Sequence, residues 1–147
     1  MFVPDGADDQ PDRRLERLLA DPPAPSQRAA FDYCSLGVAF DRRADYDKSG
    51  QCASLALGIL ESLHCQEDSW PETLILFRSL SLLGTALRQQ GAYEKAENPL
   101  IRAVELGESL PDRPELAPEA WNNLGVLCKY AGWFDLGAEA QDRKSVV

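Results

Sequence analysis

Hydrophobic residues recur along this chain at the spacing of one helix face. In the segment 121–134, Trp121, Leu124 and Cys128 stand at positions i, i+3 and i+7. Gly132 then ends the periodic run, and hydrophobic residues resume directly after it. This segment predicts a helix, a tight glycine turn and the start of a second helix.

Helix boundaries are marked by polar caps, prolines and glycines. Ser69 and Glu72 have the spacing of a capping box, which predicts a helix start. That helix should end near Gly91, and the next should begin at Tyr93 or Glu94. Pro99 lies far enough inside the next helix to bend it rather than end it. No segment alternates with a period of two and β-branched residues, so no strand is expected.

Residues 1–26 are predicted to be a partly disordered segment that contains one short helix. The first ten residues are rich in Asp, Gly and Pro, which favours disorder. The helix should end before the proline pair at 22–23 and cover the open end of the periodic region that begins at Gln27. Its apolar face is formed by Leu15, Leu18 and Leu19.

Three Leu-Gly pairs recur in register with a later aromatic residue. Successive pairs are 47 and 41 residues apart, and the aromatic residues keep the same two separations. A glycine at this position lets the partner helix approach closely. Helical hairpins repeated at this length stack into a solenoid, because no hairpin can bury its apolar face alone. The glycines are Gly37, Gly84 and Gly125, and the aromatic residues are Tyr46, Tyr93 and Phe134.

These motifs resemble the tetratricopeptide repeat (TPR), in particular the longer form of kinesin light chains. The last repeat, W-N-N-L-G-V-L-C-K-Y-A-G-W-F, and the middle repeat, G-A-Y-E-K-A-E-N-P-L-I-R-A-V-E-L, are similar to that family's pattern. Cys128 stands in place of the usual Tyr, and Ala44 replaces the turn glycine of the first repeat. The resemblance covers about residues 28–141.

The predicted fold is all-α, a right-handed α-α superhelix of about three TPR-like hairpins with a short N-terminal helix. The repeat domain is expected over 27–141, with hairpins at about 27–65, 69–110 and 114–141. The last six residues, 142–147, read D-R-K-S-V-V, which a common short-read sequencing adapter encodes in this frame. We therefore hypothesise a non-native tail on a C-terminally truncated fragment. Self-association through the exposed edge of the last repeat is then expected.

Composition and charge argue against several function classes. A net charge of −9 and a pI near 4.6 do not favour nucleic acid binding, which depends on clustered Lys and Arg. No run approaches the roughly 18 apolar residues of a membrane helix. The acidic N-terminus has no apolar signal core. The four cysteines lack C-x-x-C spacing, so we expect reduced, buried thiols in a cytoplasmic protein.

Material for an active site is sparse. His64, the single histidine, lies beside Cys65 and close to two acids. Adjacent side chains on a helix point apart and cannot share a proton, and a metal would need a second ligand at suitable spacing. No glycine-rich phosphate loop occurs. We predict no enzyme, no catalytic residue, no metal and no cofactor.

The resemblance implies a protein-interaction module, a scaffold or adaptor that holds a peptide or partner helix. In the family, the first helices of successive repeats line a concave groove. Asn side chains there can hold an extended peptide backbone, and Arg and Lys can pair with acidic groups. Register places on this face Arg78, Ser81, Thr85, Arg88, Glu119, Asn122, Val126 and Lys129, with Asn123 beside them. Seven of these residues are predicted to contact the partner: Arg78, Ser81, Thr85, Arg88, Asn122, Asn123 and Lys129.

Two other interpretations stay open. The seven polar residues are equally consistent with merely solvated helix faces. The chain could also be the regulatory segment of a larger signalling or enzymatic protein whose catalytic domain lies beyond residue 141. Binding of chaperone tails is not predicted, because Cys34 and Val38 occupy the positions where such members carry Lys and Asn. The sequence does not identify the partner.

Overall fold

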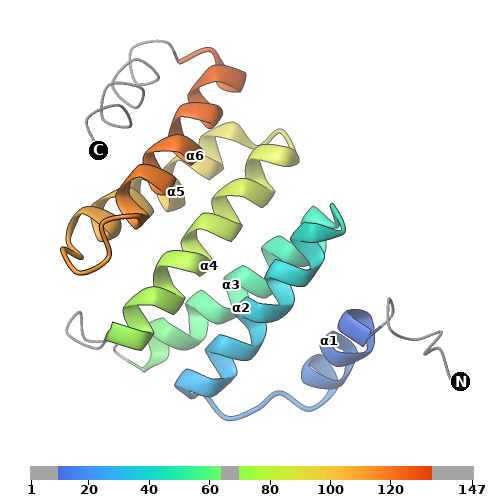
Figure 1. Cartoon of the computed structure of the whole chain (residues 1–147). Coiled ribbons are helices and arrows are strands. Elements are labelled where there is room, and N and C mark those ends of the chain that lie inside the picture. Colours follow the sequence, from blue (N-terminus) through green and yellow to red (C-terminus); the bar gives the residue numbers. More distant parts are fainter. Residues whose placement is uncertain (1–9, 64–69, 134–147) are drawn as a thin grey trace, which may run out of the picture.

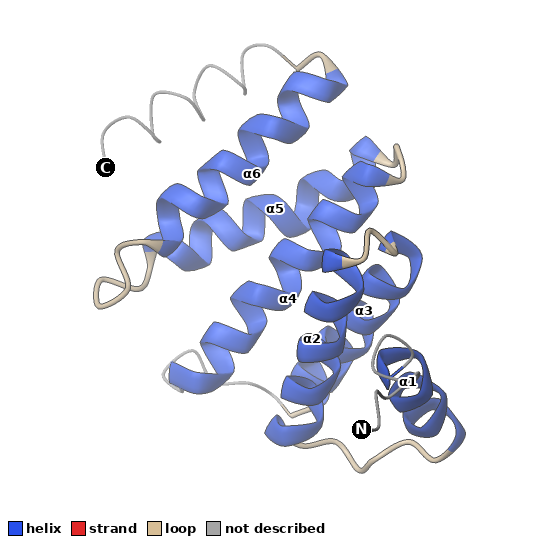
Figure 2. Cartoon of the chain, turned by 45° about the vertical axis from the view of Figure 1, so that its right-hand side comes forward, coloured by secondary structure: helices blue, strands red, loops and turns tan. Residues whose placement is uncertain are grey.

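The regular structure of this chain is helical throughout the part that the computed structural model describes, residues 10–63 and 70–133 (Figure 2). No strand occurs within these two ranges. The prediction of an all-α chain is confirmed. The helices are α1 (Gln10–Ala20), α2 (Gln27–Arg42), α3 (Tyr46–Ser62), α4 (Trp70–Gln89), α5 (Tyr93–Glu108) and α6 (Leu116–Ala131).

The helices form two layers (Figure 1). Helices α2, α4 and α6 lie in one layer, and α3 and α5 lie behind them. Each helix packs against the next one in the chain, and α4 also contacts α2 and α6 directly. This successive packing makes the molecule a helical-repeat superhelix, as predicted. The surface formed by α2, α4 and α6 is called the first-helix face below.

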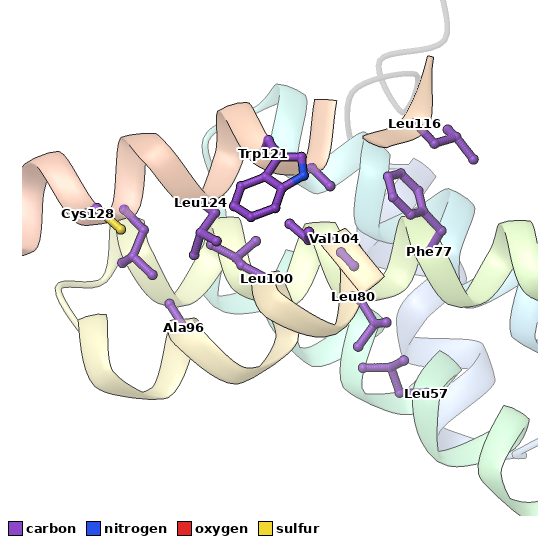
Figure 3. Close-up of a cluster of buried hydrophobic side chains, with 13 residues drawn as sticks. Leu57, Phe77, Leu80, Ala96, Leu100, Val104, Leu116, Trp121, Leu124 and Cys128 are labelled. Carbon is purple, nitrogen blue, oxygen red and sulfur yellow. The ribbon is translucent and has the colours of Figure 1, made fainter. Parts of the chain in front are cut away.

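Two clusters of buried side chains hold the layers together. The larger joins α4, α5 and α6, with Phe77, Leu100 and Leu124 at most 2% exposed (Figure 3). The smaller joins α1, α2 and α3 to Ile75 of α4, around Leu36 and Phe40, both 0% exposed. Each cluster draws side chains from more than one hairpin, so the stacking of neighbours buries what a single hairpin would leave in water.

Glycines allow the close approach between helices that the repeat pattern predicts. A Cβ atom on Gly84 would lie 2.3 Å from Cδ2 of Leu100, and one on Gly37 would lie 3.1 Å from Cδ1 of Leu82. The Gly37 carbonyl also accepts a hydrogen bond of 2.9 Å from the buried hydroxyl of Ser49 on α3. The bare backbone of α2 therefore serves both as a contact surface and as an acceptor.

Helix α1 covers the outer side of the first hairpin. Leu15 is 4% exposed and belongs to the smaller core cluster. The Asp12 carboxylate accepts hydrogen bonds from Lys48 and, at 3.1 Å, from Nη1 of Arg43. The bond from Lys48 lowers the pKa of the Asp12 carboxyl and raises the pKa of the Lys48 ammonium. An apolar contact and an ion cluster thus fasten α1 where we expected a covering helix.

In the middle hairpin, the helices end and begin close to the residues expected from the sequence. Helix α4 ends at Gln89, and Gly91 follows with a φ of +79°. Helix α5 begins at Tyr93 and continues through Pro99. The end of α6 has the same form, since its C-cap Gly132 has a φ of +77°. A left-handed residue is the common way to end a helix, and glycine adopts it without a steric penalty.

Ala44 occupies the corresponding turn of the first hairpin with a φ of +59°, a conformation that costs an L-residue about 1–2 kcal/mol. We expect Ala44→Gly to raise the free energy of unfolding by about 0.5–1 kcal/mol, because glycine removes this strain but adds backbone entropy to the unfolded chain. Urea denaturation followed by far-UV circular dichroism measures the change. In the matched control, Gln51→Gly in the exposed middle of α3 should lower stability by a similar amount. Destabilisation by both substitutions would contradict the assignment of strain to Ala44.

Several expectations lie outside the described residues. These are the disorder of the first residues, the Ser69 cap, the His64–Cys65 pair, Phe134 and the nature of 142–147. Helices α2 to α6 fall inside the hairpin ranges proposed above, but the division into domains stays a prediction. None of the described helices combines the length and the apolar character needed to cross a membrane.

Candidate partner-binding site

Two helices carry the seven residues predicted to contact a partner. Helix α4 supplies Arg78, Ser81, Thr85 and Arg88, and α6 supplies the other three. Because α4 and α6 are neighbours in the same layer, the two sets lie on neighbouring helices (Figure 1). The structure therefore places residues that are far apart in the sequence on two helices that contact each other.

An ion pair joins the two helices at one end of this face. Nη1 of Arg78 donates to Oε1 and Oε2 of Glu119, at 2.8 and 3.0 Å. The Arg78 guanidinium also lies 5.7 Å from the ring centroid of Phe77. Both members of the pair are about two-fifths exposed, so solvent screens the interaction. Arg78 is thus held in place while remaining accessible.

A cation–π contact joins the same helices further along. The guanidinium of Arg88 lies 5.7 Å from the ring centroid of Tyr130, whose side chain is 61% exposed. Sequence reasoning singled out Arg88 but missed Tyr130. The signal was a large aromatic residue directly after Lys129, on the side of the helix away from the apolar positions Trp121, Leu124 and Cys128. An exposed aromatic ring next to a cation is a common feature of protein interfaces.

The remaining predicted residues differ in their exposure. Asn122 and Lys129 are exposed, whereas Thr85 and Asn123 are half-buried. Ser81 is only 9% exposed, and its hydroxyl has no hydrogen-bond partner among the described residues. Register alone placed Ser81 on the same stripe as Arg78, but the packing of the helices leaves it almost no exposed surface.

A cavity of about 340 Å³ opens between α2 and α4. Sequence reasoning did not find it; Cys34 and Val38 were considered only as departures from another binding pattern. The available signal was a run of apolar residues on α2 at i, i+3 and i+7: Phe31 and Val38, which lie outside the smaller core cluster, and Cys34, which belongs to it. Helix α2 lines the cavity with Phe31, Cys34, Ser35 and Val38, and α4 lines it with Leu74, Ile75 and Arg78.

The cysteine that lines this cavity carries an uncharged thiol. Burial raises the pKa of the Cys34 thiol, although the Ser79 hydroxyl and the Arg78 cation act in the opposite direction. Burial likewise raises the pKa of Cys52 to about 12 and also raises that of Cys128. These three cysteines are buried and free, as predicted, and their thiols are uncharged at neutral pH. The cavity therefore offers no thiolate to a ligand.

Other parts of the described structure add little to this site. A second cavity of about 230 Å³ lies between α4 and α5, with Arg102 and Glu105 beside leucine side chains. Within residues 10–63 and 70–133, no group of three or more His, Cys, Asp or Glu side chains is arranged to hold a metal ion.

Comparison with known proteins shows a distant likeness to curated relatives. No protein-family model matches the sequence. The chain is 24% identical over 132 residues to the photosystem I assembly protein Ycf3 of Cuscuta gronovii, and equally to that of Cuscuta obtusiflora. The alignment covers 80% of this chain and 68% of each relative. Ycf3 contains tetratricopeptide repeats, so the match supports TPR-like helical repeats here. The closer resemblance to kinesin light chains stays a prediction.

Proposed function

We propose that this chain is a protein-interaction module that binds a peptide or partner helix on the first-helix face. One observation supports this most directly: an apolar cavity and exposed cationic and amide side chains occur on the same face. A partner needs both, because apolar burial supplies most of the affinity and polar contacts supply orientation and specificity. A merely solvated helix face would show the polar residues without the cavity.

The distant relatives support an adaptor or scaffold role. Their name describes a protein that assembles a multi-protein complex, and an assembly factor must contact the proteins that it assembles. By analogy, this chain would act by holding another polypeptide rather than by converting a substrate. The photosystem itself is not part of this proposal, since a likeness this distant does not support the same binding partner in both proteins.

Four further points from the sequence stay proposals beside this one. They are a regulatory role within a larger protein, self-association at the edge of the last repeat, a cytoplasmic location and the absence of nucleic acid binding. Genomic sequence beyond codon 141 separates a longer scaffold from a regulatory segment, since further repeats favour the first and a catalytic domain favours the second.

Quantitative affinity capture from cell extract tests the first-helix face. The bait is the full chain, and mass spectrometry compares it with Arg88→Ala and Asn122→Ala. We expect each substitution to reduce capture of a genuine partner by about 5-fold or more, as for loss of about 1 kcal/mol at an interface. Arg102→Ala and Asn98→Ala, exposed on α5 in the other layer, are matched controls that should leave capture unchanged. Unchanged capture by both first-helix variants would refute the assignment.

A further inference from the structure

The cavity between α2 and α4 has a cation at its edge, and that cation is already held by a carboxylate of the chain itself. We propose that the cavity receives one large apolar side chain of a partner peptide, that Arg78 binds an acidic residue next to that side chain, and that Glu119 competes with the peptide for Arg78. This inference rests on the proposed function and specifies the chemistry of the partner.

The size and walls of the cavity fit an apolar anchor. A volume of about 340 Å³ lies at the lower end of the range for ligand sites, enough for a leucine, phenylalanine or tryptophan side chain. Its walls come from two successive repeats, so an inserted side chain would contact Val38 on one side and Leu74 on the other. Phe31 is 49% exposed at the cavity, so an inserted anchor would also cover part of an aromatic ring that now faces water.

Charge selects the residue beside the anchor. Among the residues that line the cavity, the only charged one is Arg78, a cation. A guanidinium carries five N–H donors on three nitrogens, and the bonds to Glu119 use Nη1 alone. Nε and Nη2 can therefore donate to a second carboxylate. Arg28 lies near the other side of the cavity, 5.8 Å from the ring centroid of Phe31. Because Arg28 forms an ion pair with Asp32, that side is nearly neutral. An acidic neighbour is thus favoured over a basic one.

Glu119 sets the strength of this selection. It comes from α6, 41 residues from Arg78, and both its oxygens face the same guanidinium nitrogen. Both side chains of the pair are about two-fifths exposed. The attraction in an exposed ion pair favours the paired state over the unpaired state by less than about 5-fold. A peptide carboxylate can therefore displace it. Removing the charge of Glu119 leaves Arg78 fully available and should strengthen the binding of acidic peptides.

Peptide display on the full chain tests the proposal. We expect a random library to enrich peptides with a large apolar residue next to Asp or Glu. The enriched peptide, fluorescently labelled, is then titrated by anisotropy together with a version in which Asn or Gln replaces the acid. Arg78→Ala should lower the affinity for the acidic peptide about 5- to 10-fold and change the affinity for the amide peptide little. Glu119→Gln should strengthen the acidic peptide about 2- to 5-fold.

Blocking the cavity gives an independent readout. Ser35→Phe should fill the cavity and lower the affinity for both peptides about 10-fold or more. The control Ser54→Phe, at an exposed position on α3, should change neither affinity. Circular dichroism melts check that each variant folds. Phe31→Ser, which removes an exposed wall of the cavity, replaces Ser35→Phe if the latter does not fold.

The outcomes separate this inference from the function on which it rests. Enrichment of no peptide at all would overturn the proposed peptide-binding function together with the pocket. Enriched peptides without an apolar-acidic pair, or affinities that ignore both cavity variants, would overturn the pocket alone. Equal weakening of the acidic and amide peptides by Arg78→Ala would overturn the role of charge. Weaker binding to Glu119→Gln would overturn the role of Glu119 as competitor.

Discussion

Replacing Gly84 by alanine is expected to lower the free energy of unfolding by about 2–3 kcal/mol, because the added methyl group has no room. An alanine Cβ would lie 2.3 Å from Cδ2 and 2.4 Å from Cγ of Leu100. Leu100 is 1% exposed, and its Cγ is close to the backbone, so a simple rotation of the side chain cannot relieve the collision. Helices α4 and α5 would have to separate, and the larger core cluster would loosen with them.

Urea denaturation followed by circular dichroism measures this loss. The matched control is Gly58→Ala in α3, where no atom lies within 4 Å of the new Cβ. There the same change should raise stability by about 0.5–1 kcal/mol through the better helix propensity of alanine. Adding Leu100→Ala to Gly84→Ala should recover part of the loss expected from the two single variants. Similar effects of alanine at Gly58 and Gly84 would contradict the close approach.

The sequence predicted the helices and their order because both are local properties. Apolar spacing, prolines and glycines define each helix within about 20 residues, so the ends of α4 and α5 could be predicted from the sequence alone. The repeat added long-range information, since three copies in register imply the same packing three times. This is why the close contact at Gly84 and the unusual turn residue Ala44 could both be singled out from the sequence.

The candidate site was less predictable because it depends on distances between repeats. Register identified the stripe of α4 that carries Arg78 and Ser81, but only the packed structure shows that Ser81 is buried. The pairing of Arg78 with Glu119 joins residues 41 positions apart. The cavity has no local signature of its own, since it forms between side chains of α2 and α4, two helices of different repeats that pack against each other. Such spaces follow from side-chain volumes on both helices and not from either pattern alone.

Phe77 and Phe31 allow a comparison between a residue of the core and a residue of the candidate site. Phe77 is 0% exposed in the cluster that joins α4, α5 and α6 (Figure 3). Phe77→Ala should lower the free energy of unfolding by about 3–5 kcal/mol, because the surrounding side chains cannot fill the space that it leaves. This is a large part of the roughly 5–15 kcal/mol that stabilises a typical domain, so partial unfolding at 25 °C is expected.

Phe31→Ala, the same chemical change at a residue that is 49% exposed, should alter stability by less than about 1 kcal/mol. Urea titration of both variants measures the difference, with tryptophan fluorescence as a second probe of the α6 region. Because Phe31 lines the cavity, Phe31→Ala should nevertheless weaken binding of the selected acidic peptide. Equal losses of stability in the two variants would contradict the distinction between core and site. The expected result, a folded chain with impaired binding, would assign Phe31 to partner recognition rather than to the core.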